Sequence, residues 1–78
     1  MDIVQNYVKN PKELGSIVRA TRKLAKLRQA EASALCNVGV RFLSELENGK
    51  PSLHLGKTMQ VLNAFGIRIL VKGRDFTD

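Results

Sequence analysis

Few residues of the kinds that bind metals or form cross-links occur in this chain. Its 78 residues include one cysteine, one histidine and no tryptophan. One cysteine excludes an internal disulfide and a cysteine-based metal site, and no second metal ligand lies beside His54. No nucleophile has a histidine base at hand, and no glycine-rich phosphate loop is present. We therefore expect a protein that is not an enzyme and needs no cofactor and no metal. Cys36 is expected in the core rather than as an exposed redox sensor, and His54 at the surface or capping a helix.

Apolar runs and acidic residues are also scarce. The first ten residues, MDIVQNYVKN, lack the basic start and the apolar core of a secretory signal, and no stretch is long enough to span a membrane. We therefore expect a cytoplasmic protein. Seven acidic residues against thirteen basic ones give a net charge of +6, which favours a polyanionic partner. The alternative is a solvated basic surface that only aids solubility.

The length allows one small domain. A chain of 78 residues buries a modest core unless a second subunit adds to it, so a dimer is a reasonable expectation. We divide the chain into an N-terminal arm at residues 1–9, a helical domain at residues 10–66, and a C-terminal strand and tail at residues 67–78.

Capping residues and apolar spacing predict the first two helices of this domain. The first begins at Asn10 and Pro11, which are a side-chain cap and a residue tolerated in the first turn, and it ends near Lys26. The second helix is short and alanine-rich, and runs from Gln29 to Cys36 or the residue before it.

Turn residues place the two remaining helices. A tight turn at residues 37–39 leads into a third helix over residues 40–47, which is closed by Asn48 and Gly49. A fourth helix follows Pro51 and stops at Gly66. Its apolar face is expected to consist of Leu55, Thr58, Met59, Leu62 and Phe65.

The segment GIRILVKG, which begins at Gly66, has the alternation of a β-strand. Ile67, Ile69 and Val71 occupy every second position. One strand cannot satisfy its own backbone hydrogen bonds, and no second strand is evident in the sequence. We therefore expect these residues to pair with the same segment of a second copy and to form the dimerisation element of an otherwise all-α protein of four to five short helices.

Two short helices joined by a tight turn, next to a basic first helix, are the arrangement of a helix-turn-helix DNA reader. In the third helix, Leu43 and Leu46 would face inward with Phe42. The outward positions are short or polar enough to enter a major groove, and they are Val40, Arg41, Ser44, Glu45 and Asn48. An ordinary amphipathic surface helix would show the same pattern and remains the alternative.

The outward side chains match the edges of bases in duplex DNA. Arg41 can donate two hydrogen bonds to guanine O6 and N7, Glu45 can accept from cytosine N4, and Val40 can contact a thymine methyl group. Ser44 is small and polar enough to face a base as well. Glu45 repels phosphates unless it meets a cytosine amine or is neutralised by Arg41 one turn earlier.

The run LRQAEASALCNVGVRFLSELENGKPS at residues 27–52 resembles, without gaps, the helix-turn-helix of the Xre and Cro/C1-type repressors. With NPKELGSIVRATRK before it and GKTMQVLNAFGIRIL after it, the match covers residues 10–71 and is most similar to the HipB-like antitoxins. The resemblance implies a lambda-repressor-like fold and a homodimer whose C-terminal strands pair across the two-fold axis. It also implies an inverted-repeat DNA operator, repression of the protein's own operon, a nucleoid-associated location and a HipA-like kinase toxin as partner.

The same resemblance assigns roles to individual residues. It implies that Val40, Arg41, Ser44 and Glu45 face bases. It implies phosphate contacts for Arg28, Gln29, Asn48 and Lys50. It further implies a structural ion pair between Arg22 and Glu47 that joins the first helix to the end of the third.

Two other functions are compatible with these residues. One is a stand-alone phage-type or metabolic regulator of the same family without a toxin. The other is a protein-interaction module whose basic face meets an acidic protein.

Overall fold

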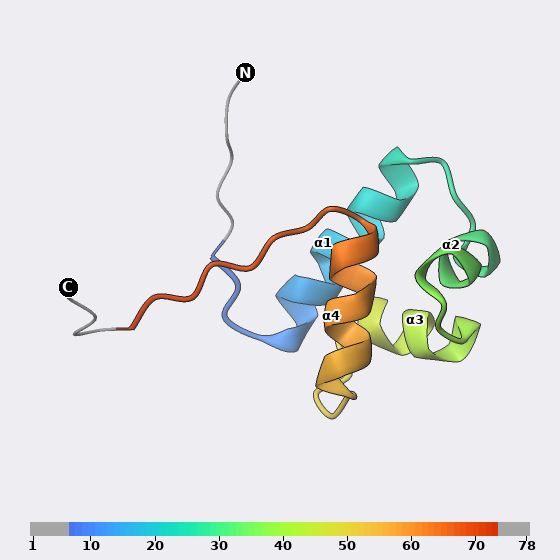
Figure 1. Cartoon of the computed structure of the whole chain (residues 1–78). Coiled ribbons are helices and arrows are strands. Elements are labelled where there is room, and N and C mark those ends of the chain that lie inside the picture. Colours follow the sequence, from blue (N-terminus) through green and yellow to red (C-terminus); the bar gives the residue numbers. More distant parts are fainter. Residues whose placement is uncertain (1–6, 74–78) are drawn as a thin grey trace, which may run out of the picture.

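The computed structural model describes residues 7–73, and this part of the chain contains four helices (Figure 1). They are α1 (Pro11–Leu24), α2 (Gln29–Cys36), α3 (Val40–Glu47) and α4 (Leu55–Ala64). The all-α prediction is confirmed over these residues, and α2 and α3 have the predicted bounds. No helix in the described range is long and apolar enough to cross a bilayer.

Side chains of the expected residues cap the starts of α1 and α4. The Asn10 side chain accepts a hydrogen bond of 2.9 Å from the Glu13 N–H, and the Glu13 carboxylate accepts one of 2.7 Å from the Lys9 N–H. At α4, Nδ1 of His54 accepts from the Lys57 N–H at 3.1 Å. His54 is therefore a helix cap, which was one of its two expected roles.

All four helices of the described range end in the same backbone motif. After each helix, one residue takes a left-handed conformation, and its N–H donates to the carbonyl three residues earlier. The next N–H donates to the carbonyl five residues earlier. The left-handed residues are Lys26 (φ 58°), Asn37 (φ 57°), Gly49 (φ 79°) and Gly66 (φ 73°). Because Lys26 already has this conformation, α1 ends at Leu24 rather than near Lys26.

The residue that follows each left-handed position returns the chain toward the core in three of the four cases. Leu27, Val38 and Ile67 are partly buried and pack against the core. The fourth, Lys50 after α3, is exposed and polar. The end of α3 therefore differs from the other three helix ends, where an apolar residue packs against the core.

The core is formed by apolar side chains from all four helices. Its buried members are Val18, Ala32, Cys36, Leu43, Leu46, Val61 and Leu62. The expected face of α4 is wrong in part: Leu55 and Met59 are 70% and 44% exposed, while Val61 is fully buried. The buried stripe of α4 instead runs through Thr58, Val61 and Leu62, so the first-turn leucine lies to one side of it.

Two glycines allow α1 and the end of α3 to lie in contact. A Cβ atom on Gly15 would lie 2.3 Å from the Leu46 carbonyl oxygen and 2.7 Å from that of Glu47. A Cβ atom on Gly49 would lie 2.6 Å from the Cα of Lys12. The two backbones are therefore closer than any other residue type would permit at these positions.

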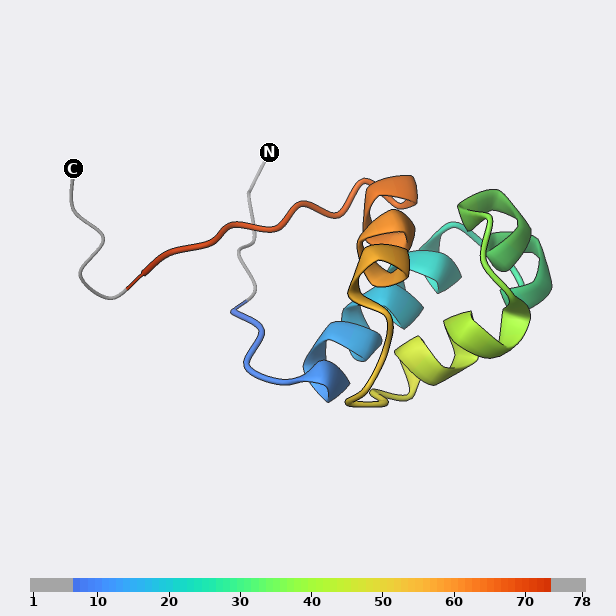
Figure 2. The same cartoon turned by 60° about the horizontal axis from the view of Figure 1, so that its bottom comes forward.

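Beyond α4 the described chain is extended and forms no strand. Ile67 is half-buried, whereas Ile69 is 53% and Val71 82% exposed. The two views show this segment leading away from the helices (Figures 1 and 2). A single chain offers it no partner strand, so pairing across a homodimer stays a prediction. Residues 1–6 of the expected arm and residues 74–78 of the expected tail lie outside the described range.

Candidate nucleic-acid interface

The turn between α2 and α3 is fixed by α4. Asn37 ends α2 in the left-handed conformation, with φ 57° and ψ 44°. The Gln60 side chain of α4 donates hydrogen bonds of 2.8 Å to the Cys36 carbonyl and 3.1 Å to the Asn37 carbonyl. The relative orientation of α2 and α3 therefore depends on a contact that crosses to α4. Sequence reasoning missed Gln60, because nothing near it in the chain indicates which carbonyl it reaches.

α3 has one face in the core and one face toward solvent. Leu43 and Leu46 are buried and Phe42 packs against the core, as predicted. On the other face Arg41 and Asn48 are exposed, Val40 is 47% exposed, and Ser44 and Glu45 are half-buried. The structure thus brings the four expected base-contacting residues and Asn48 onto one side of α3, away from Leu43 and Leu46.

Three of the expected DNA-contacting side chains form an ion cluster. The Glu45 carboxylate lies 3.5 Å from Nε of Arg41 and 3.2 Å from Nζ of Lys50. The first of these contacts is the expected neutralisation one turn apart on the helix. The second was not expected. It forms because the Lys50 N–H is bonded to the Glu45 carbonyl at 3.0 Å in the motif that ends α3.

The expected phosphate-binding residues at the start of α2 differ in exposure. Arg28 is exposed, and its backbone N–H donates to the Glu31 carboxylate at 2.8 Å. Gln29 is half-buried, and its amide nitrogen donates to Glu47 Oε1 at 3.1 Å. Gln29 therefore contacts the end of α3, and one amide hydrogen remains for a ligand because the group carries two.

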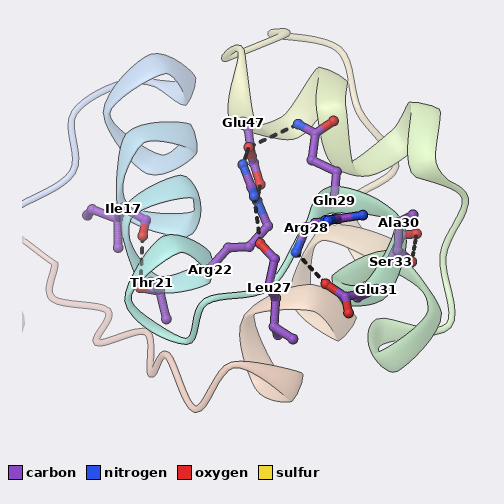
Figure 3. Close-up of polar contacts among 10 residues, drawn as sticks. All are labelled: Ile17, Thr21, Arg22, Leu27, Arg28, Gln29, Ala30, Glu31, Ser33 and Glu47. Carbon is purple, nitrogen blue, oxygen red and sulfur yellow. Dashed lines mark hydrogen bonds and ion pairs between the residues drawn. The ribbon is translucent and has the colours of Figure 1, made fainter.

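The Arg22–Glu47 ion pair is present and buried (Figure 3). Nε and Nη2 of Arg22 donate to the two carboxylate oxygens of Glu47 at 2.6 and 2.9 Å, and Nη1 donates to the Leu27 carbonyl at 2.8 Å. The two side chains are 10% and 2% exposed. Every buried side-chain nitrogen and oxygen in the described residues has a hydrogen-bond partner. The pair therefore joins α1, the link to α2, the first turn of α2 and the end of α3.

Both members of this pair are charged. Burial acts to raise the pKa of Glu47, but hydrogen bonds from Arg22 and Gln29, with the positive charges of Arg22 and Arg19, outweigh it and hold the pKa below its usual range. The hydrogen bond to Glu47 raises the pKa of Arg22 against the opposing effect of burial. Two-point contact between the guanidinium and the carboxylate fixes the orientation of both side chains.

Cys36 lies in the core at 2% exposure, as expected, and burial raises the pKa of its thiol. A raised pKa keeps the thiol protonated and unreactive near neutral pH. In the described residues, no group of three histidine, cysteine or acidic side chains is placed to hold a metal ion.

Comparison with known proteins agrees with this geometry. Residues 18–71 match the family model described as Helix-turn-helix. An uncharacterised HTH-type transcriptional regulator y4mF of Sinorhizobium fredii is 44% identical over 62 residues, which are 80% of this chain and 82% of that protein.

Solved structures share the fold at much lower identity. A HipA-HipB-O2-O3 complex contains a chain with a TM-score of 0.79 and 14% identity, and a HipB-O4 20mer complex contains one with 0.78 and 14%. In both cases the match covers 91% of this chain and 100% of the other. The arrangement of α2, the turn and α3, the family match and the bacterial relative agree, and the chain belongs to the Xre-type helix-turn-helix family of DNA-binding transcription regulators.

Proposed function

We propose that this protein is a homodimeric repressor that inserts α3 of each subunit into the major groove of an inverted-repeat operator. The observation that carries the proposal is the outward face of α3, where short and polar side chains gather while the opposite face is held in the core. A two-fold dimer must place both reading helices on one face of the duplex, so its half-sites lie about one helical turn, or a multiple of it, apart. Ile67, Ile69 and Val71 supply the pairing strands of that dimer.

The residues of the proposed interface have two kinds of role. Val40, Arg41, Ser44 and Glu45 read bases from the first turns of α3. Four others hold phosphates on either side of the groove, and they are Arg28, Gln29, Asn48 and Lys50. Phosphate contacts fix the register of the protein on DNA, and base contacts choose the sequence.

Substitutions at Arg41 and Lys50 should separate these roles. Arg41→Ala is expected to lose about 1 to 3 kcal/mol of binding free energy at one guanine, and to bind duplexes that lack this guanine almost as well as wild type does. Lys50→Ala should weaken binding to the operator and to its variants at the Arg41 guanine alike, and should reduce the salt slope by about 1. Fluorescence anisotropy on an operator duplex and its single-base variants, over a range of salt, measures both. A footprint without two-fold symmetry would contradict the dimeric mode.

We further propose that the protein is the antitoxin of a HipA-like kinase and represses the operon that encodes both. The fold it shares with HipB, which occurs with HipA in a solved complex, supports this. Affinity purification of the chain expressed from its native operon, followed by mass spectrometry, should recover a kinase-like protein encoded in the adjacent reading frame. Purification of the chain alone, from an operon with no kinase-like gene, would instead indicate a stand-alone regulator.

A further inference from the structure

The outward face of α3 carries a negative charge where a DNA-binding surface is expected to be positive. Glu45 lies on this face, and its side chain is 29% exposed, whereas those of Arg41 and Lys50 are 90% and 45% exposed. The carboxylate is therefore the most confined of the three groups. Its position is set by the helix, and the two longer side chains fold onto it.

Both cations that contact Glu45 have roles in the proposed interface. The Arg41 guanidinium lies one helical turn before Glu45, with Nε 3.5 Å from Oε2. Nζ of Lys50 lies 3.2 Å from the same oxygen. The same carboxylate oxygen therefore lies near both cations. If Arg41 and Lys50 both turn to DNA, the Glu45 carboxylate loses both of its partners.

The backbone brings Lys50 close to Glu45. Lys50 follows Gly49, whose left-handed φ of 79° closes α3, and the Lys50 N–H is bonded to the Glu45 carbonyl at 3.0 Å. At the other three helix ends the equivalent residue is apolar and turned to the core. The motif thus carries Lys50 back toward Glu45 instead of anchoring the chain.

We propose that Glu45 is a specificity-determining residue that withholds Arg41 and Lys50 from DNA until a cytosine amine replaces them as partner of its carboxylate. This inference rests on the proposed DNA-binding function and adds a restraint to it. On a duplex without cytosine at the matching position, either the cations stay paired with Glu45 or the carboxylate faces phosphates unpaired. Both states lower affinity. On the matching sequence cytosine N4 donates to Glu45, and both cations are released to guanine and phosphate.

Glu45→Gln tests the inference because glutamine keeps the size of the side chain and removes its charge. Glu13→Gln is the matched control. It makes the same change of net charge on α1, where the carboxylate only accepts from the Lys9 N–H and the amide oxygen of glutamine can do the same. Circular dichroism confirms that both variants are folded.

Binding is measured by fluorescence anisotropy at several salt concentrations on two probes. One is a short mixed-sequence duplex, and the other is a duplex that the wild-type protein selects from a random library. Glu45→Gln should bind the mixed-sequence duplex about tenfold tighter than wild type, with a salt slope steeper by about 1 to 2, because two cations become available for phosphates. Its preference for the selected duplex should fall by about tenfold or more. Glu13→Gln should keep the wild-type preference.

Each outcome has a distinct meaning. If Glu45→Gln binds the mixed-sequence duplex no tighter than Glu13→Gln, or keeps the full wild-type preference, the restraint by Glu45 is wrong while the proposed function stands. If wild type binds neither probe in a salt-dependent way, the proposed function fails and this inference fails with it.

Discussion

Glu47→Ala should lose about 3 to 5 kcal/mol of unfolding free energy, because it leaves the Arg22 guanidinium buried without a counter-charge. A domain of this length has about 4 to 12 kcal/mol in total, so the variant should lose about a quarter of its stability or more, and at the low end of this range it would be largely unfolded. The Gln29 amide, which donates to the same carboxylate at 3.1 Å, loses its acceptor as well. Urea denaturation followed by circular dichroism at neutral pH measures the loss.

A double variant provides the control. Arg22→Met combined with Glu47→Leu removes both charges and fills the space with apolar atoms, so it should be much more stable than Glu47→Ala alone. Arg22 also donates to the Leu27 carbonyl at 2.8 Å, so some loss remains when both charges are gone. A single variant within about 1 kcal/mol of wild type would show that water reaches the pair and that it is not buried in solution.

The same pair predicts how stability varies with pH. The pKa of Glu47 is held below its usual range in the folded protein, whereas in the unfolded chain it is about 4.3. Folding therefore gains stability from Glu47 above the unfolded value, and this gain is lost as the pH falls through the folded pKa. The melting temperature of wild type should fall more steeply below about pH 4.5 than that of the Arg22→Met, Glu47→Leu variant, in which this carboxylate is absent.

Gly15→Ala should destabilise the protein by about 3 kcal/mol or more, at the upper end of the cost of overpacking. Helix propensity alone predicts the opposite sign, since alanine in place of glycine favours a helix by about 1 kcal/mol. The steric term decides the result, because the new Cβ would lie 2.3 Å from the Leu46 carbonyl oxygen. This oxygen belongs to the backbone of α3, so α3 itself has to move.

Ser16→Ala is the control for Gly15→Ala. Ser16 is the next residue of α1, it is exposed, and its hydroxyl donates only to the Lys12 carbonyl at 3.1 Å. The unfolding free energy of Ser16→Ala should stay within about 0.5 kcal/mol of the wild-type value. Thermal melting of the two variants side by side, with DNA binding as a second measurement, distinguishes displacement of α3 from a general effect on α1. Equal melting temperatures for both variants would contradict the close contact.

Helix bounds could be predicted from the sequence because local residues determine them. Asn10 caps α1 and Asn37 ends α2 through contacts within a few residues, and the structure confirms both. α4 was harder because two of its sides are apolar. Local spacing alone does not decide between the side with Met59 and the side with Val61, since the choice depends on where α2 and α1 lie.

Only the part of the candidate site that lies on a single helix could be predicted from sequence periodicity. The outward residues of α3 follow from helical periodicity, and the Arg22–Glu47 pair followed from family resemblance. The contact of Lys50 with Glu45 arises from the motif that ends α3, and that of Gln29 with Glu47 from the meeting of α2 and α3. Pairing of the C-terminal segments depends on a second chain, and the sequence pattern of one chain does not determine where that second chain lies.

The contact between Gly49 and Lys12 bears on the proposed binding of α3 to DNA. A Cβ at Gly49 would lie 2.6 Å from the Lys12 Cα, and the adjacent Gly15 meets the last carbonyls of α3 in the same way. α3 therefore cannot tilt or slide without carrying α1 with it. In the proposed binding mode, a reading helix held so firmly would need little reorganisation on binding DNA, so that little affinity would be lost to it.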